Sequence, residues 1–337
     1  MTLTSRHHAG RISYFSVMQA LVLTADTFGI TTVSDPLPSA GQSCVSVLAA
    51  GLNRRDQWIR EGKYAKIMYP AILGSDACGL TESGQRVIID PSFDWGNDAA
   101  AQSADYHILG MPSQGTIAQM VCVPTVNLHP APQHCTDVQA AALPLAGVTA
   151  YRAVMVRGAL QPNETVVITG IGGGVATLAM QMALAAGARV FVTSGSDAKI
   201  ERAKQLGASG GVNYHDDTWV KQLVAMAGSV DLAIDSAGGR VLNDLSAVVR
   251  PGGRIVFYGA TTGPTPLLNL HRIFWKQLDV RGSTMGSPAD FRAMLAFVNK
   301  HRIVPVVDCE VPFHDAVRAF DLIATSDQFG KIVITMS

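Results

Sequence analysis

Hydrophobic residues in the middle of the chain fall into short and long runs that alternate. Residues 165–169 are apolar or β-branched, a glycine cluster follows, and 175–186 is an apolar segment without proline. A second short apolar run occupies 189–193. This order predicts a strand, a glycine turn, a helix and a second strand, which together form a βαβ unit. Backbone N–H groups at the start of such a helix attract anions, so the turn suits a pyrophosphate.

The same alternation continues to about residue 284. Strands that alternate with helices indicate a parallel, doubly wound sheet of the Rossmann type, so we expect an α/β fold. Further predicted strands are 211–214, 230–235, 254–259 and 278–284, and predicted helices are 198–206, 217–226 and 241–248.

The pattern on either side of this unit differs. Between residues 18 and 144, short apolar runs are separated by turn residues, which is typical of a small β-rich domain. Candidate strands are 19–23, 42–49, 85–89 and 117–123, and helical patterns begin at 137 and 149. After residue 287, helices are predicted at 288–300 and 313–324 and strands at 306–309 and 331–335. This tail is too short for a domain, so we expect it to complete the β-rich one.

These patterns divide the chain into three parts. We expect residues 1–17 to be a disordered extension, 18–143 with 287–337 to form the β-rich domain, and 144–286 to bind a dinucleotide. The first 17 residues are polar and lack the apolar segment of a signal peptide.

Composition adds mainly exclusions. The 337 residues are 48% hydrophobic and 15% charged, and their formal net charge is zero. This balance supports large hydrophobic cores, gives no excess of positive charge that would attract nucleic acid, and predicts no membrane segment. Five scattered cysteines without a Cys-x-x-Cys spacing indicate free thiols and a cytoplasmic protein. We expect Trp95, Trp219 and Trp275 to be packing residues.

The glycine turn and the following strand end carry the cofactor prediction. Gly172, Gly173, Gly174 and Val175 lie between a predicted strand and helix, the context in which a glycine cluster indicates a dinucleotide. The next strand ends in Thr-Ser-Gly-Ser at 193–196, where an NAD-binding unit usually has a carboxylate.

Small hydroxyl residues at this strand end leave room for a 2′-phosphate. Ser194, Gly195 and Ser196 would surround it, and Lys199 and Tyr214 would supply a charge and a hydroxyl. We therefore expect NADP(H) rather than NAD(H). In the alternative interpretation, Lys199 is only a solvated helix residue.

Several ordered motifs together resemble one family. They are LNRRDQWIREGKY (52–64), PAILGSDACG (70–79), LPLAGVTAYRA (143–153), the glycine turn, Asp231–Gly239, RPGGRIVFYG (250–259), FWKQLDVRGSTMGS (274–287) and QFGKIVI (328–334). With them the chain resembles the medium-chain dehydrogenase/reductase superfamily. The resemblance implies a GroES-like catalytic domain made from both chain ends, a central Rossmann domain, and hydride transfer in the cleft between them. It also implies cofactor contacts at Thr149, Ser236, Gly259 and Lys331, the last with the pyrophosphate.

The chain departs from the zinc-binding members of that superfamily. Asn53, Ser75 and Leu145 lie in the motifs that carry the three catalytic zinc ligands, and residues 92–112 contain none of the cysteines that hold structural zinc. We therefore expect no metal and a resemblance to the zinc-free quinone oxidoreductase branch. In that branch Asn53 would contact developing charge on oxygen, although it can instead only stabilise a loop, and Tyr64, Arg55 and Asp56 are weaker catalytic candidates. Asp56 and Asp76 can instead pair with arginines as a structural network.

The functional prediction is an NADPH-dependent, zinc-independent oxidoreductase that reduces quinones or activated C=C or C=O bonds. The alternatives are an alcohol dehydrogenase-like enzyme and a sensor that binds NADPH without turnover. We expect the protein to bind a small-molecule substrate, and to bind neither nucleic acid nor a membrane. Residues 278–284 would form an edge strand available to a second copy, so we expect a homodimer.

Overall fold

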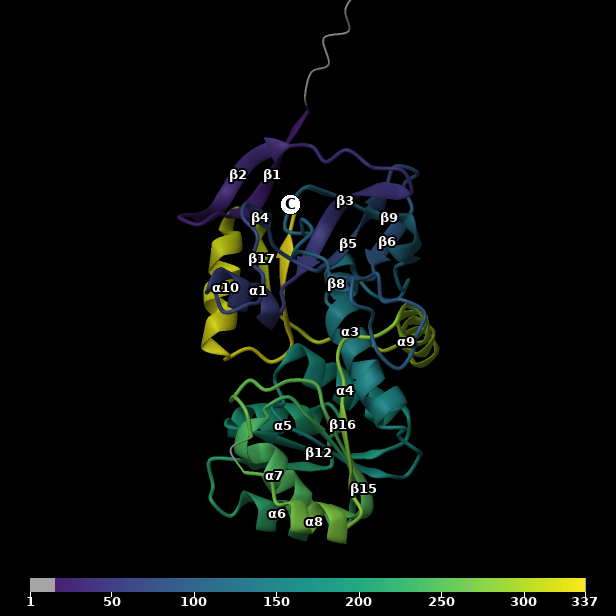
Figure 1. Ribbon diagram of the computed structural model, residues 1–337, viewed down its shortest axis with the longest axis vertical. Helices are drawn as coiled ribbons and strands as arrows, with labels where there is room; N and C mark the ends of the chain where they lie inside the picture. Colours follow the sequence, from purple (N-terminus) through teal and green to yellow (C-terminus); the bar gives the residue numbers. More distant parts are fainter. Residues whose placement is uncertain (1–15, 266, 337) are drawn as a thin grey trace, which may run out of the picture.

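The computed structural model describes residues 16–265 and 267–336. Two halves lie one above the other along the longest axis (Figure 1). One half contains the first part of the chain together with its last strands, and the other contains the middle of the chain. Residues 1–15 of the predicted extension lie outside the described residues, whereas Val17 is the first residue of a strand rather than part of that extension.

The middle of the chain forms a six-stranded parallel sheet. Its strand order is β13-β12-β11-β14-β15-β16, so the direction of winding reverses between β11 and β14, as in a Rossmann fold. The strands are β11 (Thr165–Ile168), β12 (Arg189–Ser194), β13 (Gly210–Asn213), β14 (Val230–Asp235), β15 (Val249–Phe257) and β16 (Asp279–Gly282). The helices are α4 (Gly174–Ala185), α5 (Asp197–Gln205), α6 (Trp219–Ala227), α7 (Gly239–Val248) and α8 (Leu270–Trp275). The predicted α/β fold class is confirmed.

The other half is built mainly on antiparallel strands, with one parallel pair. One sheet has the order β2-β1-β4, and a larger one has the order β10-β6-β5-β3-β18-β17 with β9 also on β3. The strands are β1 (Val17–Leu23), β2 (Phe28–Ser34), β3 (Gln42–Gly51), β4 (Ala71–Ile72), β5 (Asp76–Thr81), β6 (Arg86–Ile89), β7 (Ser92–Phe93), β8 (His107–Ile108), β9 (Met120–Pro124), β10 (Leu128–Pro130), β17 (Val307–Pro312) and β18 (Lys331–Thr335). Because β18 pairs with β3, strands from both ends of the chain share this sheet.

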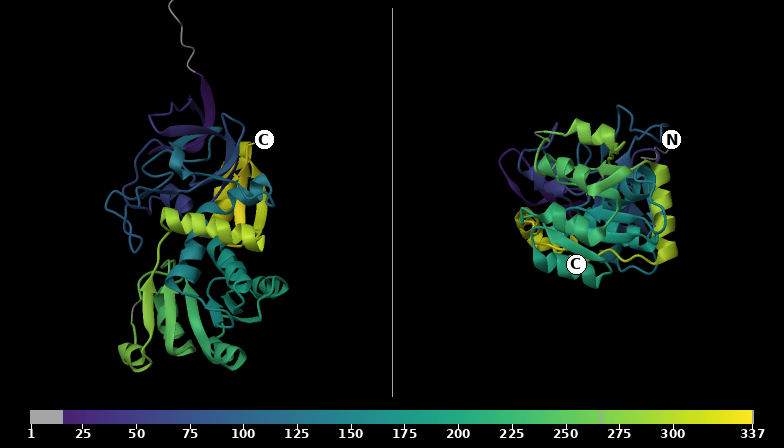
Figure 2. Two further views of the ribbon diagram at one scale, coloured as in Figure 1. Left: turned by 90° about the vertical axis from the view of Figure 1, so that its right-hand side faces the viewer. Right: turned by 90° about the horizontal axis from the view of Figure 1, so that it is seen from below.

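Helices connect and cover these sheets. They are α1 (Arg54–Arg60), α2 (Asp137–Ala141), α3 (Pro144–Tyr151), α9 (Pro288–His301) and α10 (Ala316–Thr325), with a π-helical segment η2 (Arg152–Arg157) after α3 and short 3-10 turns η1 (Thr125–Asn127) and η3 (Phe313–Asp315). Helix α9 lies across the junction of the two halves, against α3 (Figure 2). Its start is fixed by a capping box between Ser287 and Asp290, with Pro288 in the first turn.

Helix α1 is an element that the hydrophobic pattern did not predict. Its buried residues include Arg55, Asp56 and Gln57, so its inward face has no apolar stripe. The local signal is at its start, where the Asp56 carboxylate accepts a hydrogen bond from the Asn53 backbone N–H at 2.8 Å. This capping box begins the helix and points charged side chains into the molecule.

Two predictions about single residue types are wrong. Cys44 on β3 and Cys122 on β9 lie directly opposite each other and form a disulfide, so these two are not free thiols. The pair was not evident from the sequence because 78 residues separate its members. Trp275 is 82% exposed rather than packed, because α8 buries none of its residues. Trp95 and Trp219 are buried as expected.

Candidate active site

Two cavities meet at the glycine turn and form one groove between the halves. The inner cavity, of about 310 Å³, lies toward the β-rich half, and the outer cavity, of about 620 Å³, lies over the parallel sheet. Residues common to both include Gly170, Gly173, Ser236 and Arg54. The groove therefore passes the ends of β11 and β14, the crevice where such sheets bind ligands.

The glycine turn leaves the start of α4 free for a ligand. Gly173 is the N-cap and supplies no side chain, so the first N–H groups of the helix have no side-chain acceptor. Two side chains pass close beneath the turn. A Cβ atom at Gly172 would lie 2.9 Å from Lys199 Cδ, and one at Gly174 would lie 2.6 Å from Lys331 Cδ. Glycine is thus required by close approach as well as by the positive φ of 119° at Gly172.

The outer cavity has hydroxyl groups and two aromatic side chains that were not predicted there, His215 and Trp219. The Ser194 hydroxyl accepts a hydrogen bond from the Ser196 backbone N–H at 3.2 Å, which fixes the strand end. Above Gly195 lie the Tyr214 hydroxyl and the His215 ring, since a Cβ atom there would be 2.7 Å from Tyr214 Oη and from His215 Nε2. Sequence reasoning missed His215, although it directly follows Tyr214.

Two cations line the outer cavity and bind the same residue, Ser326. The Lys199 ammonium donates to the Ser326 carbonyl at 2.6 Å, and the Arg54 guanidinium donates to the Ser326 hydroxyl at 2.7 Å. Partial burial lowers the pKa of Lys199 from its ordinary value. One carboxylate, Asp327, also lines this cavity. The balance of charge still favours an anion such as a phosphate.

The inner cavity has a closed polar network at its floor. The Lys331 ammonium donates to Asn53 Oδ1 at 2.5 Å and to Asp76 Oδ2 at 3.0 Å, and Asn53 Nδ2 donates to Asp76 Oδ2 at 2.9 Å. All three side chains are at least nine-tenths buried. Both ends of the Asn53 amide are therefore bonded, with one N–H of Nδ2 left over. The Lys331 ammonium is engaged in this network, and its contact with the pyrophosphate, which the resemblance implies, stays a prediction.

Asp76 forms an ion pair with Lys331 and not with an arginine, which corrects the pairing we considered. Its second oxygen accepts the Leu145 backbone N–H at 2.8 Å. The Ser75 hydroxyl donates to the Leu109 carbonyl at 2.8 Å and accepts from Arg55. The resemblance places zinc ligands at Asn53, Ser75 and Leu145. The Asn53 amide and the Ser75 hydroxyl are already hydrogen-bonded, and Leu145 has only an alkyl side chain. Among the residues that the structure describes, no group of His, Cys, Asp and Glu could hold a metal ion.

Arg55 and Tyr64 form the wall of the inner cavity. The Arg55 guanidinium lies 5.0 Å from the centre of the Tyr64 ring, and its Nη1 donates to the Ser75 hydroxyl at 2.6 Å and to the Leu109 carbonyl at 2.8 Å. Its Nη2 is buried and has no hydrogen-bond partner among the described residues. A buried donor of this kind is costly to leave unpaired, so a side-chain movement that brought it into contact with a ligand's acceptor would be favourable.

Asp56 lies behind this wall, fully buried. Burial raises its pKa to about 6, although Arg55 at 4.0 Å and the Asn53 N–H favour the charged form. Its Oδ1 has no hydrogen-bond partner among the described residues. The carboxyl therefore ionises near neutral pH.

The structure brings every predicted site residue to this groove. The inner cavity is lined by Asn53, Arg55, Tyr64, Thr149, Gly173, Gly174, Val175, Ser236, Gly259 and Lys331, and the outer one by Gly172, Gly173, Ser194, Gly195, Ser196, Lys199, Tyr214 and Ser236. Trp58, Leu145 and Gln328 also line the inner cavity. Trp58, Leu145 and Gln328 come from three distant segments of the chain, so no local sequence pattern shows that they lie close together.

Comparisons with known proteins agree with this architecture. Residues 39–133 match the alcohol dehydrogenase GroES-like domain, and residues 174–300 match the family described as zinc-binding dehydrogenase. The chain belongs to the medium-chain dehydrogenase/reductase superfamily, whose members use a nicotinamide cofactor, and it is an oxidoreductase.

Three similar proteins give the range of the relationship. The zinc-type alcohol dehydrogenase-like protein YogA of Leptosphaeria maculans is 33% identical, covering 90% of this chain and 93% of its own. The quinone oxidoreductase of Mus musculus is 27% identical and covers 97% of each chain. The crystal structure of an NAD-dependent alcohol dehydrogenase has a TM-score of 0.90 at 31% identity, covering 95% of this chain and all (100%) of its own.

Proposed function

We propose that the protein is an NADPH-dependent, zinc-independent reductase of quinones or of activated C=C or C=O bonds. The observation that carries the proposal is the inner cavity. There Asn53, Asp76 and Lys331 bond to one another, and Arg55 offers a buried, unpaired N–H. These residues do not fit a catalytic zinc ion, and they do fit a substrate with a carbonyl oxygen as acceptor.

The outer cavity supports NADP(H) as the cofactor. Ser194 and Gly195 leave space at the strand end, and Lys199, Arg54 and Tyr214 surround it. These groups would hold the 2′-phosphate, while the bare start of α4 would receive the pyrophosphate. When bound, the nicotinamide supplies the hydride.

The chain's own groups orient the substrate and stabilise charge. The Arg55 Nη2–H would donate to the substrate oxygen as it gains charge, and Tyr64, stacked on the guanidinium, would pack against the substrate. The remaining Asn53 N–H would be a second donor. Because Lys331 and Asp76 hold the Asn53 amide in place, this donor is already oriented before substrate binds.

A panel of acceptors tests the proposal. Purified protein should oxidise NADPH with quinones or enones, and Arg55→Met should lower kcat/KM by about 10²-fold while leaving NADPH affinity unchanged. Arg55→Lys, which keeps the charge but loses the planar donors, serves as the matched variant. Equal activity in all three proteins would rule out Arg55 as the oxygen-binding group.

A second candidate function is suggested by the names of the relatives, two of which are alcohol dehydrogenase-like. An alcohol dehydrogenase of this superfamily uses zinc to acidify the hydroxyl. One zinc ion per chain in metal analysis, with oxidation of alcohols, would support it. Tight NADPH binding without turnover of any acceptor would instead support a sensor.

We also propose a homodimer in which β16 and α8 meet a second copy. Strand β16 is at the edge of the parallel sheet, and Leu270, Phe274 and Trp275 on the preceding helix are 66%, 62% and 82% exposed. Light scattering should give twice the monomer mass, and Trp275→Ser should shift it toward the monomer. A cytoplasmic location stays a prediction; no helix in the described part of the chain is long and apolar enough to cross a membrane.

A further inference from the structure

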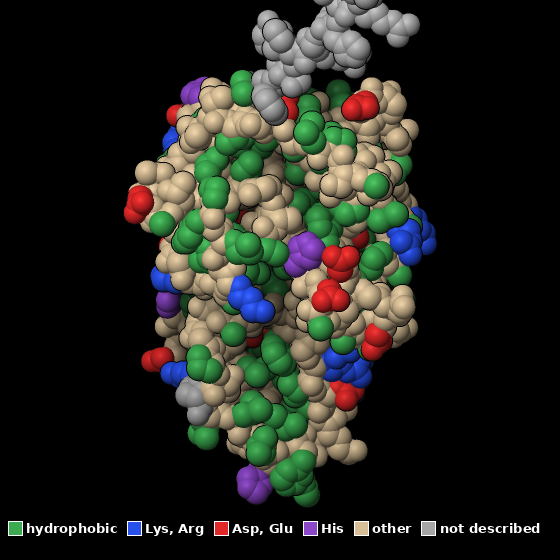
Figure 3. Space-filling view, turned by 45° about the horizontal axis from the view of Figure 1, so that its top comes forward, with side chains coloured by type: hydrophobic (Ala, Val, Ile, Leu, Met, Phe, Trp, Pro, Cys, Tyr) green, Lys and Arg blue, Asp and Glu red, His purple; other side chains and the backbone are tan. Residues whose placement is uncertain are grey.

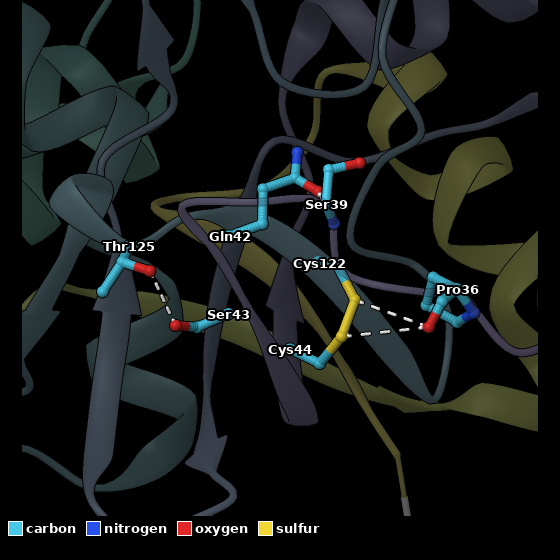
Figure 4. Close-up of a disulfide and its surroundings, with 7 residues drawn as sticks. All are labelled: Pro36, Ser39, Gln42, Ser43, Cys44, Cys122 and Thr125. Carbon is cyan, nitrogen blue, oxygen red and sulfur yellow. Dashed lines mark hydrogen bonds between the residues drawn. A yellow bond between two sulfur atoms is a disulfide. The ribbon is translucent and has the colours of Figure 1, made fainter.

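The Cys44–Cys122 disulfide lies outside the groove. It joins β3 and β9 at a position where the two residues are already paired across the sheet (Figure 4). Neither cysteine lines the inner or the outer cavity. Because the hydrogen bonds of the sheet hold these strands together, the cross-link is not needed to keep them adjacent. This position leaves the bond free to open and close without loss of the fold.

Cys44 and Cys122 are more accessible than two of the other three cysteines. Both are half-buried, as is Cys309, whereas Cys78 and Cys135 are buried. Burial raises the pKa of Cys78 to about 12, so this thiol stays protonated and unreactive. Burial and the nearby Asp308 carboxylate raise the pKa of the half-buried Cys309 thiol as well. Thiol chemistry depends on access and on thiolate formation, so it should concentrate at Cys44 and Cys122.

A cavity adjoins each side of the disulfide. Cys122 lines a cavity of about 630 Å³ in the β-rich half, and Cys44 lines a different one of about 490 Å³. In the space-filling view, hydrophobic side chains are spread over both halves of the visible face (Figure 3). Residues 36–38 separate the two cavities, since Pro36 and Leu37 line the larger one and Pro38 the smaller. A small thiol can thus approach Cys122 while the Cys44 sulfur has its own space on the other side.

The Pro36 carbonyl distinguishes the two redox states. Its oxygen lies 3.6 Å from Cys122 Sγ and 3.8 Å from Cys44 Sγ (Figure 4). Thiols can donate hydrogen bonds to a carbonyl at these distances, but disulfide sulfurs carry no hydrogen and cannot. Reduction therefore supplies two donors to this carbonyl, and oxidation removes both.

We propose that Cys44 and Cys122 form a reversible thiol–disulfide exchange site for low-molecular-weight thiols and disulfides. In the oxidising direction, the Cys122 thiolate attacks a small disulfide, whose S–S bond breaks as a mixed disulfide forms and one small thiolate leaves. The Cys44 thiolate then attacks the Cys122 sulfur and expels the second small thiolate. Two electrons pass from the protein to the small disulfide, and the two protons lost by the cysteines are taken up by the two released thiolates.

The reduced state then holds the segment 35–41 more firmly. Its thiols bind the Pro36 carbonyl, and Leu37, which is 84% exposed, follows this anchor. In the oxidised state the same segment keeps the Gln42 side-chain bond to the Ser39 N–H at 3.0 Å but loses the two sulfur donors. The redox state of the two cysteines therefore affects the segment that separates the two cavities.

Equilibration of the full-length protein with mixtures of reduced and oxidised glutathione tests the proposal. Trapping with iodoacetamide and mass spectrometry should show a two-electron, reversible transition confined to Cys44 and Cys122, with Cys78, Cys135 and Cys309 remaining thiols. In Cys44→Ser, Cys122 should form a stable mixed disulfide with one glutathione. Amide hydrogen exchange at Leu37 and Ala40 should be slower in the reduced protein than in the oxidised one.

A matched variant separates exchange from structure. Cys44→Val/Cys122→Val should fold, retain NADPH oxidation, and show no redox dependence of exchange at Leu37. Five free thiols at every glutathione ratio would overturn the proposal, as would a disulfide that exchanges only after denaturation. Faster exchange at Leu37 on reduction would overturn the role of the Pro36 carbonyl.

Discussion

At its outer end the groove is lined by Ser194, Gly195, Lys199 and Tyr214, of which Ser194 is buried and the other three are at least partly exposed. At its inner end, side chains from the N-cap of α1, from β5 and from β18 bond to one another. Partly exposed polar groups are available to a ligand, whereas a closed buried network is rigid before any ligand arrives. The outer end is therefore suited to recognition and the inner end to fixed orientation. Substitutions should affect the two ends differently.

The largest effect is expected at the inner network. Lys331→Met should lower the free energy of unfolding by about 3–5 kcal/mol, because it leaves the Asp76 carboxylate buried without its cation. Lys199→Met at the outer end removes a partly exposed bond to a carbonyl and should cost about 1 kcal/mol or less. Urea unfolding followed by circular dichroism measures both.

A double variant serves as the control for this comparison. Lys331→Met/Asp76→Asn should recover part of the loss, since no uncompensated charge remains in the core. Equal stabilities of the Lys331 and Lys199 variants would contradict the distinction between the two ends.

The raised pKa of Asp56 at the inner end should make the free energy of unfolding depend on pH. The pKa of Asp56 is raised from 3.8 to about 6 in the folded protein, so folding favours its protonated form. The stabilisation of the folded protein by this carboxyl is fully present below pH 3.8. It is lost as the pH rises from 3.8 through 6, which lowers the free energy of unfolding by about 3 kcal/mol. Unfolding free energies measured from pH 4 to pH 7 should fall less steeply with pH in Asp56→Asn. Parallel pH profiles for the two proteins would show that burial does not shift this carboxyl.

Cofactor choice is the corresponding test of the outer end. Ser194→Asp places a carboxylate at the strand end, where it would repel a 2′-phosphate and can bind a ribose hydroxyl. The ratio of NADH to NADPH dissociation constants should fall at least about tenfold, or about 1.4 kcal/mol. Fluorescence titration with each cofactor measures the ratio, and Ser194→Ala, which adds no charge, should change it little. An unchanged preference in the Asp variant would refute the 2′-phosphate site.

The smallest effect is expected from a single methyl group. A Cβ atom in Gly195→Ala would meet the ends of the Tyr214 and His215 side chains at 2.7 Å. Tyr214 is 44% exposed and can move aside, so stability should change by about 0.5 kcal/mol or less. NADPH should bind roughly fivefold more weakly, about 1 kcal/mol, since the displaced groups line its site. A loss of stability with unchanged NADPH affinity would mean that these side chains support the fold and not the ligand.

The outer end of the groove could be predicted from the sequence, whereas the inner end could not. The strand, turn and helix around Gly172 and the strand end at Ser194 are local patterns, so both the fold class and the outer cavity could be inferred from them. The network of Asn53, Asp76 and Lys331 could not, because its bonds span 255 and 278 residues of sequence. The resemblance pointed to these positions but not to their partners.

Two further differences have physical causes. Helix α1 was missed because its buried face carries Arg55 and Asp56 in place of an apolar stripe, although the capping box was present in the sequence. The disulfide was missed because cross-strand register, and not cysteine spacing, places Cys44 opposite Cys122.

The position of β18 has a consequence for how the protein is made. This strand lies between β3 and β17, and it carries Lys331 into the network that begins near the start of the chain. A ribosome will have released the whole parallel sheet before residues 331–335 exist, so that sheet can fold while the larger antiparallel sheet still lacks an inner strand. Until then Asp76 has no ammonium to pair with, and the edge of β3 is open. The part of the molecule begun first in translation is thus completed last, and until then the open edge of β3 can pair with another strand.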